Sequence, residues 1–224
     1  MSLRLLSYGD RAVLAEVDEL DQVLALHEEL EATRPDGVLD VVPAARSLAV
    51  VVDPHRMPLQ SARAWVAAAF DRLRHPVHGA PLQVAHAAQT GAHRHGTARA
   101  VTIDVDYDGE DLPEVASILG LTVDEVVDLH TGTPWRVAFG GFALGFGYLV
   151  TDHDRLIVPR RDEARAVVPA GSVGLAGEFS GVYPRSGPGG WQLIGTTDAP
   201  LWDPNRDPAA LLSPGTTVTF RRRS

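Results

Sequence analysis

The chain has 224 residues, enough for one large domain or two small ones, and 45% of them are hydrophobic, which is ample for a core. The formal net charge of −9 argues against nucleic-acid binding, which needs a clustered positive field. The sequence has no cysteine and no lysine, which excludes thiol nucleophiles, thiolate metal sites, disulfides, Schiff-base chemistry and the lysine of phosphate-binding loops.

The first 75 residues alternate between strand and helix patterns. Apolar alternation predicts strands at 3–6, 13–17, 38–42 and 47–52, and helical spacing predicts helices at about 20–30 and 59–73. The order ββαββα is typical of an α+β layer with the helices on one face of the sheet. No apolar run near the N-terminus approaches the roughly 18 residues of a membrane span, so we expect no membrane contact and a cytoplasmic protein.

The periodicity disappears between residues 77 and 98, which are rich in Ala, Gly, Pro and His. We therefore predict an N-terminal α+β domain at 1–76, a linker or loop at 77–98 and a second domain at 99–224. His93 and His95 could bind a divalent metal in principle, but no carboxylate or further ligand lies at useful spacing, so we expect no metal site.

Two short helices are predicted after a strand at 100–107. Asp111-x-x-Glu114 and Thr122-x-x-Glu125 both fit the capping box, in which the first side chain accepts a hydrogen bond from a free backbone amide. His130 falls on the apolar face near the end of the second helix. It is either a satisfied core histidine or a histidine that borders an active groove.

Residues 136–191 hold most of the glycine and aromatic residues of the second half. Glycine alone enters positive φ at no steric cost, so this density predicts short strands joined by tight turns, and hence a small barrel or sandwich. We expect most of the aromatic residues to be core and a minority to line a groove: Phe139, Phe142, Phe146, Tyr148, Phe179, Tyr183 and Trp191.

No enzyme signature is found in this run. The nucleophile elbow and the dinucleotide-binding glycine pattern are absent. Arg160 and Arg161 could offer paired forks for a carboxylate or phosphate, or they could be a surface pair without a ligand. On one strand only one of the two can face a given side.

The chain resembles the KipI family, also called allophanate hydrolase subunit 1 or the B subunit of 5-oxoprolinase. The resemblance rests on motifs in order along most of the chain: Gly120-Leu121-Thr122, Leu129-His130, Gly141-Phe142-Ala143, Gly145-Phe146, Tyr148-Leu149, Pro159-Arg160-Arg161, Val168-Pro169-Ala170-Gly171-Ser172-Val173, Tyr183-Pro184, Pro188-Gly189-Gly190-Trp191 and Pro214-Gly215. The chain departs from the family pattern at Leu144, Gly147, Glu178, Phe179 and Gly187.

The resemblance implies an N-terminal α+β sandwich domain followed by a cyclophilin-like β-barrel. It also implies a non-autonomous subunit of an ATP-dependent 5-oxoprolinase, which opens 5-oxoproline to glutamate. The expected partners are a KipA-like protein (allophanate hydrolase subunit 2, or the C subunit of 5-oxoprolinase) and a protein like the A subunit of 5-oxoprolinase. The alternatives are a regulator that inhibits a sensor histidine kinase, or a subunit of an allophanate hydrolase or urea carboxylase system.

Position beside the family motifs gives candidate roles. We expect the proton-transfer residues to be His130 and Glu178, and the residues that bind substrate or phosphate to be Arg136, Arg160, Arg161, Ser172 and Tyr183. The groove or partner interface is expected at Phe142, Phe146, Tyr148 and Trp191. ATP would be the cofactor, at a site on this chain or shared with a partner, and neither a metal nor biotin is expected.

Overall fold

A computed structural model describes residues 2–75 and 99–223. These residues fall into two compact units, divided between residues 87 and 88. The predicted linker and the pair His93 and His95 lie outside the described residues. The domain bounds at 76 and 99 therefore stay a prediction.

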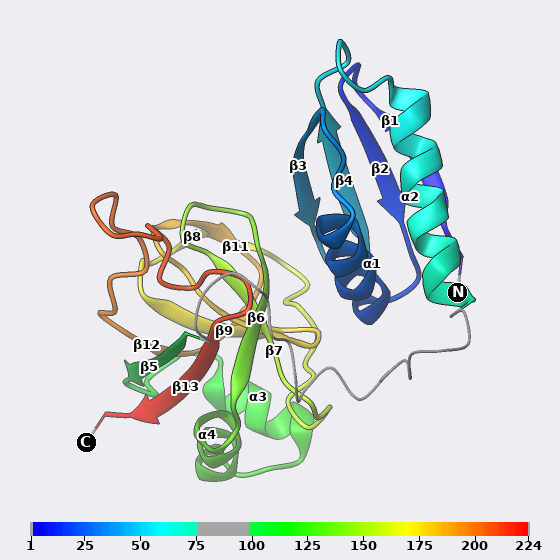
Figure 1. Cartoon of the computed structure of the whole chain (residues 1–224). Coiled ribbons are helices and arrows are strands. Elements are labelled where there is room, and N and C mark those ends of the chain that lie inside the picture. The colour runs from blue at the N-terminus through cyan, green and yellow to red at the C-terminus, as the bar shows by residue number, and fades with distance from the viewer. Residues whose placement is uncertain (1, 76–98, 224) are drawn as a thin grey trace. The chain divides into compact units, whose positions relative to one another are not determined.

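The first unit is a four-stranded antiparallel sheet in the order β1-β2-β4-β3, with two helices (Figure 1). Its elements are β1 Arg4–Tyr8, β2 Ala12–Glu16, α1 Leu20–Ala32, β3 Val38–Pro43, β4 Ser47–Val52 and α2 Leu59–Arg74. Leu48, Val50 and Val52 alternate along β4 and are fully buried, as the period of two predicts. Both helices supply apolar side chains to this core, including Val23, Leu26, Leu30, Ala62, Val66 and Phe70. The predicted ββαββα layer is confirmed.

The second unit is built on a seven-stranded sheet in the order β12-β9-β10-β7-β6-β13-β5, and a short two-stranded sheet, β11-β8, lies beside it. Its elements are β5 Ala100–Val105, α3 Leu112–Leu119, α4 Val123–Gly132, β6 Trp135–Gly140, β7 Gly147–Val150, β8 Arg165–Val168, β9 Ser172–Ala176, β10 Phe179–Val182, β11 Gly187–Gly189, β12 Gln192–Thr196 and β13 Thr217–Arg222. The pairs are antiparallel except β13 and β5, which are parallel.

The seven-stranded sheet closes on itself. Its two edge strands, β5 and β12, meet where Asp106 and Thr196 exchange backbone hydrogen bonds of 2.9 and 2.8 Å. The strand edges come so close that a Cβ on Gly195 would lie 2.5 Å from the Asp106 carbonyl oxygen, and a Cβ on Gly109 would lie 2.3 Å from the Leu193 carbonyl oxygen. The seven strands therefore form a nearly closed barrel, as predicted.

The barrel has an apolar layer on each side of its wall. Its interior is filled by side chains from all seven strands, and α3 and α4 add Val115, Ala116, Val126 and Val127. Outside the wall, a smaller cluster joins Phe146, Val168, Ala176, Tyr183, Trp191 and Leu193. All five residues of β9 are buried because both faces of this strand are covered.

Closure depends on the absence of a side chain at Gly109, so we predict that Gly109→Ala destabilises the barrel. The new Cβ would meet backbone atoms, which cannot turn aside as a side chain can, and the expected loss is about 3 kcal/mol or more of the free energy of unfolding, measured in urea. Gly132→Ala is the control, because nothing lies within 4 Å of a Cβ at that helical position. Equal stability of the two variants would contradict this account of closure.

Candidate functional site

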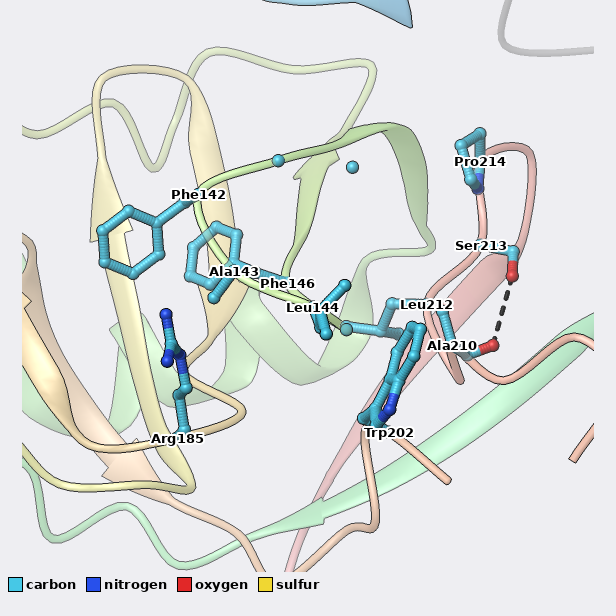
Figure 2. A pocket seen from close by; sticks show the side chains of 13 residues that line it. Phe142, Ala143, Leu144, Phe146, Arg185, Trp202, Ala210, Leu212, Ser213 and Pro214 are labelled. Atoms are coloured by element: carbon cyan, nitrogen blue, oxygen red, sulfur yellow. Dashed lines mark hydrogen bonds between the residues drawn. The ribbon is translucent and has the colours of Figure 1, made fainter. Parts of the chain in front are cut away.

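An open pocket of about 550 Å³ lies beside the loop that joins β6 to β7 (Figure 2). One wall is the loop itself, residues 140–146, and the other is formed by Trp202 and residues 210–214, with Arg185 also lining the pocket. Three large apolar side chains in this pocket are exposed to solvent, Phe142 by 57%, Leu144 by 69% and Trp202 by 40%. A cluster of exposed apolar groups of this kind marks a binding surface more often than an isolated exposed residue does.

Backbone geometry fixes the loop of the first wall. Phe142 has a φ of 62°, the one positive φ of a non-glycine residue in the described parts of the chain. The loop is held by hydrogen bonds from the Phe146 amide to the Ala143 carbonyl (3.0 Å) and from the Gly141 amide to the Phe146 carbonyl (3.2 Å). Strained backbone that persists in this way concentrates at sites of function.

The second wall is held by Arg206. Its guanidinium donates hydrogen bonds to the carbonyl oxygens of Pro200 (3.1 Å) and Ala209 (2.8 Å), and so ties together the two ends of the 200–209 loop. Leu201 and Trp202 lie against Gly145, whose φ is 85° and where a Cβ would come within 3.1 Å of both residues. The two walls therefore touch at Gly145.

The four predicted groove residues come together in one aromatic cluster with Tyr183, which was predicted to bind substrate or phosphate. The Phe146 ring lies 5.3 Å from Phe142, 5.0 Å from Tyr148, 5.5 Å from Tyr183 and 5.4 Å from Trp191, in edge-to-face contacts. Phe146, Tyr183 and Trp191 are buried in this cluster, Tyr148 is half-buried and Phe142 is exposed. Three of the five thus form a core, and Phe142 and Tyr148 present a surface.

Arg160 and Arg161 lie outside the strands, before β8, so the strand argument does not apply to them, and they differ in their contacts. Arg161 donates a hydrogen bond of 2.7 Å to the Asp111 carboxylate. Arg160 is exposed, and its guanidinium lies 3.7 Å from where a Cβ on Gly190 would be. Among the described residues Arg160 has no ion pair.

Asp111 is the centre of a buried ionic network that the sequence pattern did not reveal. Its carboxylate accepts hydrogen bonds from Arg161, from Arg165 (2.8 Å to each oxygen) and from the Leu193 amide (2.7 Å). Its side chain is only 6% exposed, and that of Arg165 only 15%. The capping box predicted at Asp111 is therefore wrong, since this side chain caps no helix amide, whereas the box at Thr122 and Glu125 is confirmed.

His130 lies in the core with no exposed surface. Its Nδ1 is 2.7 Å from the Tyr107 hydroxyl, its Nε2 is 2.9 Å from the Ser180 hydroxyl, and its ring stacks on Phe220 at 4.3 Å. Burial lowers the pKa of His130 to about 3. Both ring nitrogens are occupied, so this geometry favours the core interpretation over the groove interpretation.

The remaining predicted site residues are not gathered at the pocket. Ser172 is buried on β9, Arg136 is half-buried on β6, and Glu178 is exposed at the turn between β9 and β10. In the parts of the chain that the structure covers, no three His, Asp or Glu side chains are grouped to hold a metal ion. No helix in residues 2–75 or 99–223 is long and apolar enough to cross a membrane.

Of the residues that line the pocket, only Phe142 and Phe146 were predicted as groove residues, and the large side chains missed from sequence include Leu144, Arg185 and Trp202. The signal at Leu144 was its departure from the family pattern. An apolar side chain in a glycine-rich loop has no core to enter, so it is left exposed. Trp202 and Arg185 gave no local signal, because each reaches the pocket from a segment far in sequence from residues 140–146.

The family described as "Carboxyltransferase domain, subdomain C and D" matches residues 3–212. The chain is 38% identical over 191 residues to the 5-oxoprolinase B subunit of Bacillus subtilis (strain 168), which covers 84% of this chain and 77% of that protein. It is 48% identical over 126 residues to the 5-oxoprolinase B subunit of Escherichia coli O157:H7, 55% of this chain and 58% of the relative.

Solved structures show the same fold. The crystal structure of TTHA0988 has a TM-score of 0.69 at 34% identity, over 96% of this chain and 40% of that one. The K. lactis urea amidolyase has a TM-score of 0.72 at 16% identity, over 99% of this chain and 15% of that one, and shows likeness of fold alone. The chain therefore spans less than half of TTHA0988 and little more than half of the E. coli relative.

The ionic network predicts a large effect of Asp111→Asn on stability. The variant replaces the buried carboxylate by a neutral amide and leaves Arg165 with only the exposed Glu110 as its counter-ion. Loss of one member of a buried pair costs about 3 kcal/mol or more, measured as the free energy of unfolding in urea. The matched control is Asp198→Asn, which removes an ion pair to Arg223 in which the aspartate is 82% exposed. That loss should stay below about 1 kcal/mol, and similar losses in both variants would contradict the assignment.

Burial of neutral His130 predicts that stability falls with acid. The pKa is about 3 in the folded state and near 6.5 when unfolded, so the unfolded chain binds the proton first as the pH falls. The contribution is fully present above pH 6.5 and is lost below it, by about 1.4 kcal/mol per pH unit. His130→Gln should therefore show a shallower decline in the free energy of unfolding between pH 6.5 and 5, and parallel declines would disprove the prediction.

Proposed function

We propose that this chain works as one subunit of an ATP-dependent 5-oxoprolinase. It belongs to the family described as "Carboxyltransferase domain, subdomain C and D", and it is similar to the B subunit of 5-oxoprolinase. The observation that carries the proposal is its similarity to that B subunit over most of its length. The reaction would open the lactam of 5-oxoproline to give glutamate, and ATP would activate the lactam carbonyl by phosphorylating its oxygen.

The chain would work with a KipA-like partner and a protein like the A subunit of 5-oxoprolinase. What supports this is the character of the pocket beside residues 140–146, which is open and has Phe142, Leu144 and Trp202 exposed around it. Exposed apolar side chains of this size lower the free energy of association when a second surface covers them. We propose that the KipA-like partner covers this pocket and completes a cleft.

Negatively charged groups in the cleft would be bound by arginine, because the chain has no lysine. Arg185 in the pocket and Arg160 beside the aromatic cluster have no carboxylate partner in the described residues, and each could hold a carboxylate or phosphate group. Arg161 is less suited to this role since it is engaged by Asp111. Glu178 is exposed and remains a candidate for proton transfer, whereas His130 has no ring nitrogen open to a substrate.

The test is reconstitution of the full chain with its KipA-like partner and a protein like the 5-oxoprolinase A subunit. We expect ATP hydrolysis that depends on 5-oxoproline and releases glutamate, and no turnover with urea. Leu144→Asp should weaken binding of the KipA-like protein at least about tenfold, because it places a charge in an apolar contact, and should lower glutamate formation accordingly.

Ile118→Asp is the control for this variant, since Ile118 is exposed by 41% on α3 and does not line the pocket. It should leave binding and turnover unchanged. A chain that inhibits a sensor histidine kinase and gives no turnover in the assembled complex would overturn the proposal in favour of a regulator. Turnover of urea with biotin would favour a urea carboxylase role.

A further inference from the structure

We propose that Arg160 and Tyr148, above a floor formed by Tyr183 and Trp191, make a binding site for the carboxylate of a small organic acid. The site lies on the outer face of the barrel, where the turn at residues 189–191 passes the aromatic cluster. Its elements are far apart in sequence, on β7, after β10, and in the segments before β8 and β12, and barrel closure brings them together.

Arg160 is set apart from the arginines next to it by its lack of a partner. Arg161 and Arg165 are both bound to Asp111, and Arg165 also binds Glu110 at 2.7 Å. Their positive charges are therefore already compensated. The exposed guanidinium of Arg160, which has no ion pair among the described residues, keeps its two-pronged set of donors for a ligand.

Tyr148 is held in a fixed orientation by rings on several sides. Phe139 stacks on it at 4.5 Å, and Phe146, Phe179 and Trp191 meet it edge to face at 5.0, 5.4 and 5.7 Å. No hydrogen bond is made by its hydroxyl group within the described residues. A rigid ring that carries an unused hydroxyl is preorganised to donate to an acceptor.

The floor of the site is fixed by a close backbone approach. A Cβ on Gly189 would lie 2.4 Å from the Tyr183 hydroxyl, so only glycine lets this hydroxyl rest against the turn. The Tyr183 and Trp191 rings meet edge to face, with their centroids 6.4 Å apart. These contacts hold Tyr183 and Trp191 together next to Gly190, and a Cβ on Gly190 would lie 3.7 Å from the Arg160 guanidinium.

Both tyrosines stay protonated donors at neutral pH. Burial raises the pKa of Tyr148 and the pKa of Tyr183, and the positive charge of Arg160 acts on both in the opposite direction. That influence on both hydroxyls agrees with the position of Arg160 beside them. A neutral phenol can donate its O–H hydrogen, and a guanidinium has donors alone, so the pair suits an anion and not a cation.

The number of charges favours a carboxylate over a phosphate. One uncompensated guanidinium balances one negative charge, and its planar fork matches the two oxygens of a carboxylate. Phosphate carries close to two charges at neutral pH and would need a second free cation, which Arg161 and Arg165 do not supply. The aromatic rings around the site suit an apolar body attached to the carboxylate.

The identity of the acid rests on the proposed function, under which it would be 5-oxoproline, whose ring has one carboxylate and an apolar edge. The site itself does not depend on that identity. Binding to the isolated full chain tests the site, and turnover in the assembled complex tests the function, so the two can fail separately.

The experiment is a titration of the full chain with 5-oxoproline, followed by the backbone amide NMR signals of residues 189–191. We expect the shifts to saturate with 5-oxoproline. We expect its uncharged carboxamide to bind at least about tenfold more weakly than 5-oxoproline itself. Arg160→Gln should weaken binding at least about tenfold, and Tyr148→Phe, which keeps the ring, should weaken it about three- to tenfold.

Arg155→Gln is the matched control, because it removes the same charge from an exposed side chain of the barrel and should leave the affinity unchanged. Absence of saturable shifts with 5-oxoproline, acetate and glutarate alike would overturn the site. Equal affinity of wild type and Arg160→Gln, or tighter binding of inorganic phosphate than of any carboxylate, would also overturn it. Binding of acetate or glutarate but not of 5-oxoproline would support the site and count against the proposed substrate.

Discussion

The buried carboxylate of Asp111 is the interaction on which the barrel depends. It reaches the Leu193 amide on β12, the Arg165 guanidinium on β8 and Arg161 in the preceding segment, and it stands immediately before α3. A buried charge is tolerated only when its hydrogen bonds are satisfied, so each of these elements is required to take a fixed place around it. The same requirement engages Arg161, and Arg160 has no ion pair among the described residues. One carboxylate thus joins α3, β8 and β12 and engages one arginine of the pair.

A filled barrel directs function to its outer surface. The interior is occupied by side chains from every strand, as is usual for barrels of this size, so no ligand cavity is expected there. The second apolar layer, on the outside, supplies rigid aromatic rings and the glycine turns between them. Both the pocket at residues 140–146 and the site at Arg160 border that outer layer. They share Phe146 as a common support, since its ring contacts both Phe142 and Tyr148.

Local patterns predicted what depends on local contacts. The ββαββα order, the glycine-rich barrel strands and the capping box at Thr122 follow from periods and end signals that neighbouring residues carry. The box at Asp111 failed because its carboxylate meets Arg165, 54 residues away, which competes for the same oxygens. At His130 sequence left two interpretations open, and only the contacts with Tyr107 and Ser180 decide between them. The sequence predicted part of the pocket, including Phe142. It did not predict Trp202, which reaches the pocket through its packing on Gly145.

The position of β13 has a consequence for how the chain folds. This strand, the last of the barrel, lies between β5 and β6 in the sheet, and its Arg221 pairs with Asp104, 117 residues earlier. During synthesis β5 must therefore wait for its parallel neighbour until nearly the whole barrel sequence has been made. Until then its backbone groups present an unpaired edge to other chains. A chaperone, or early capture by a companion protein, would protect the nascent chain over this interval.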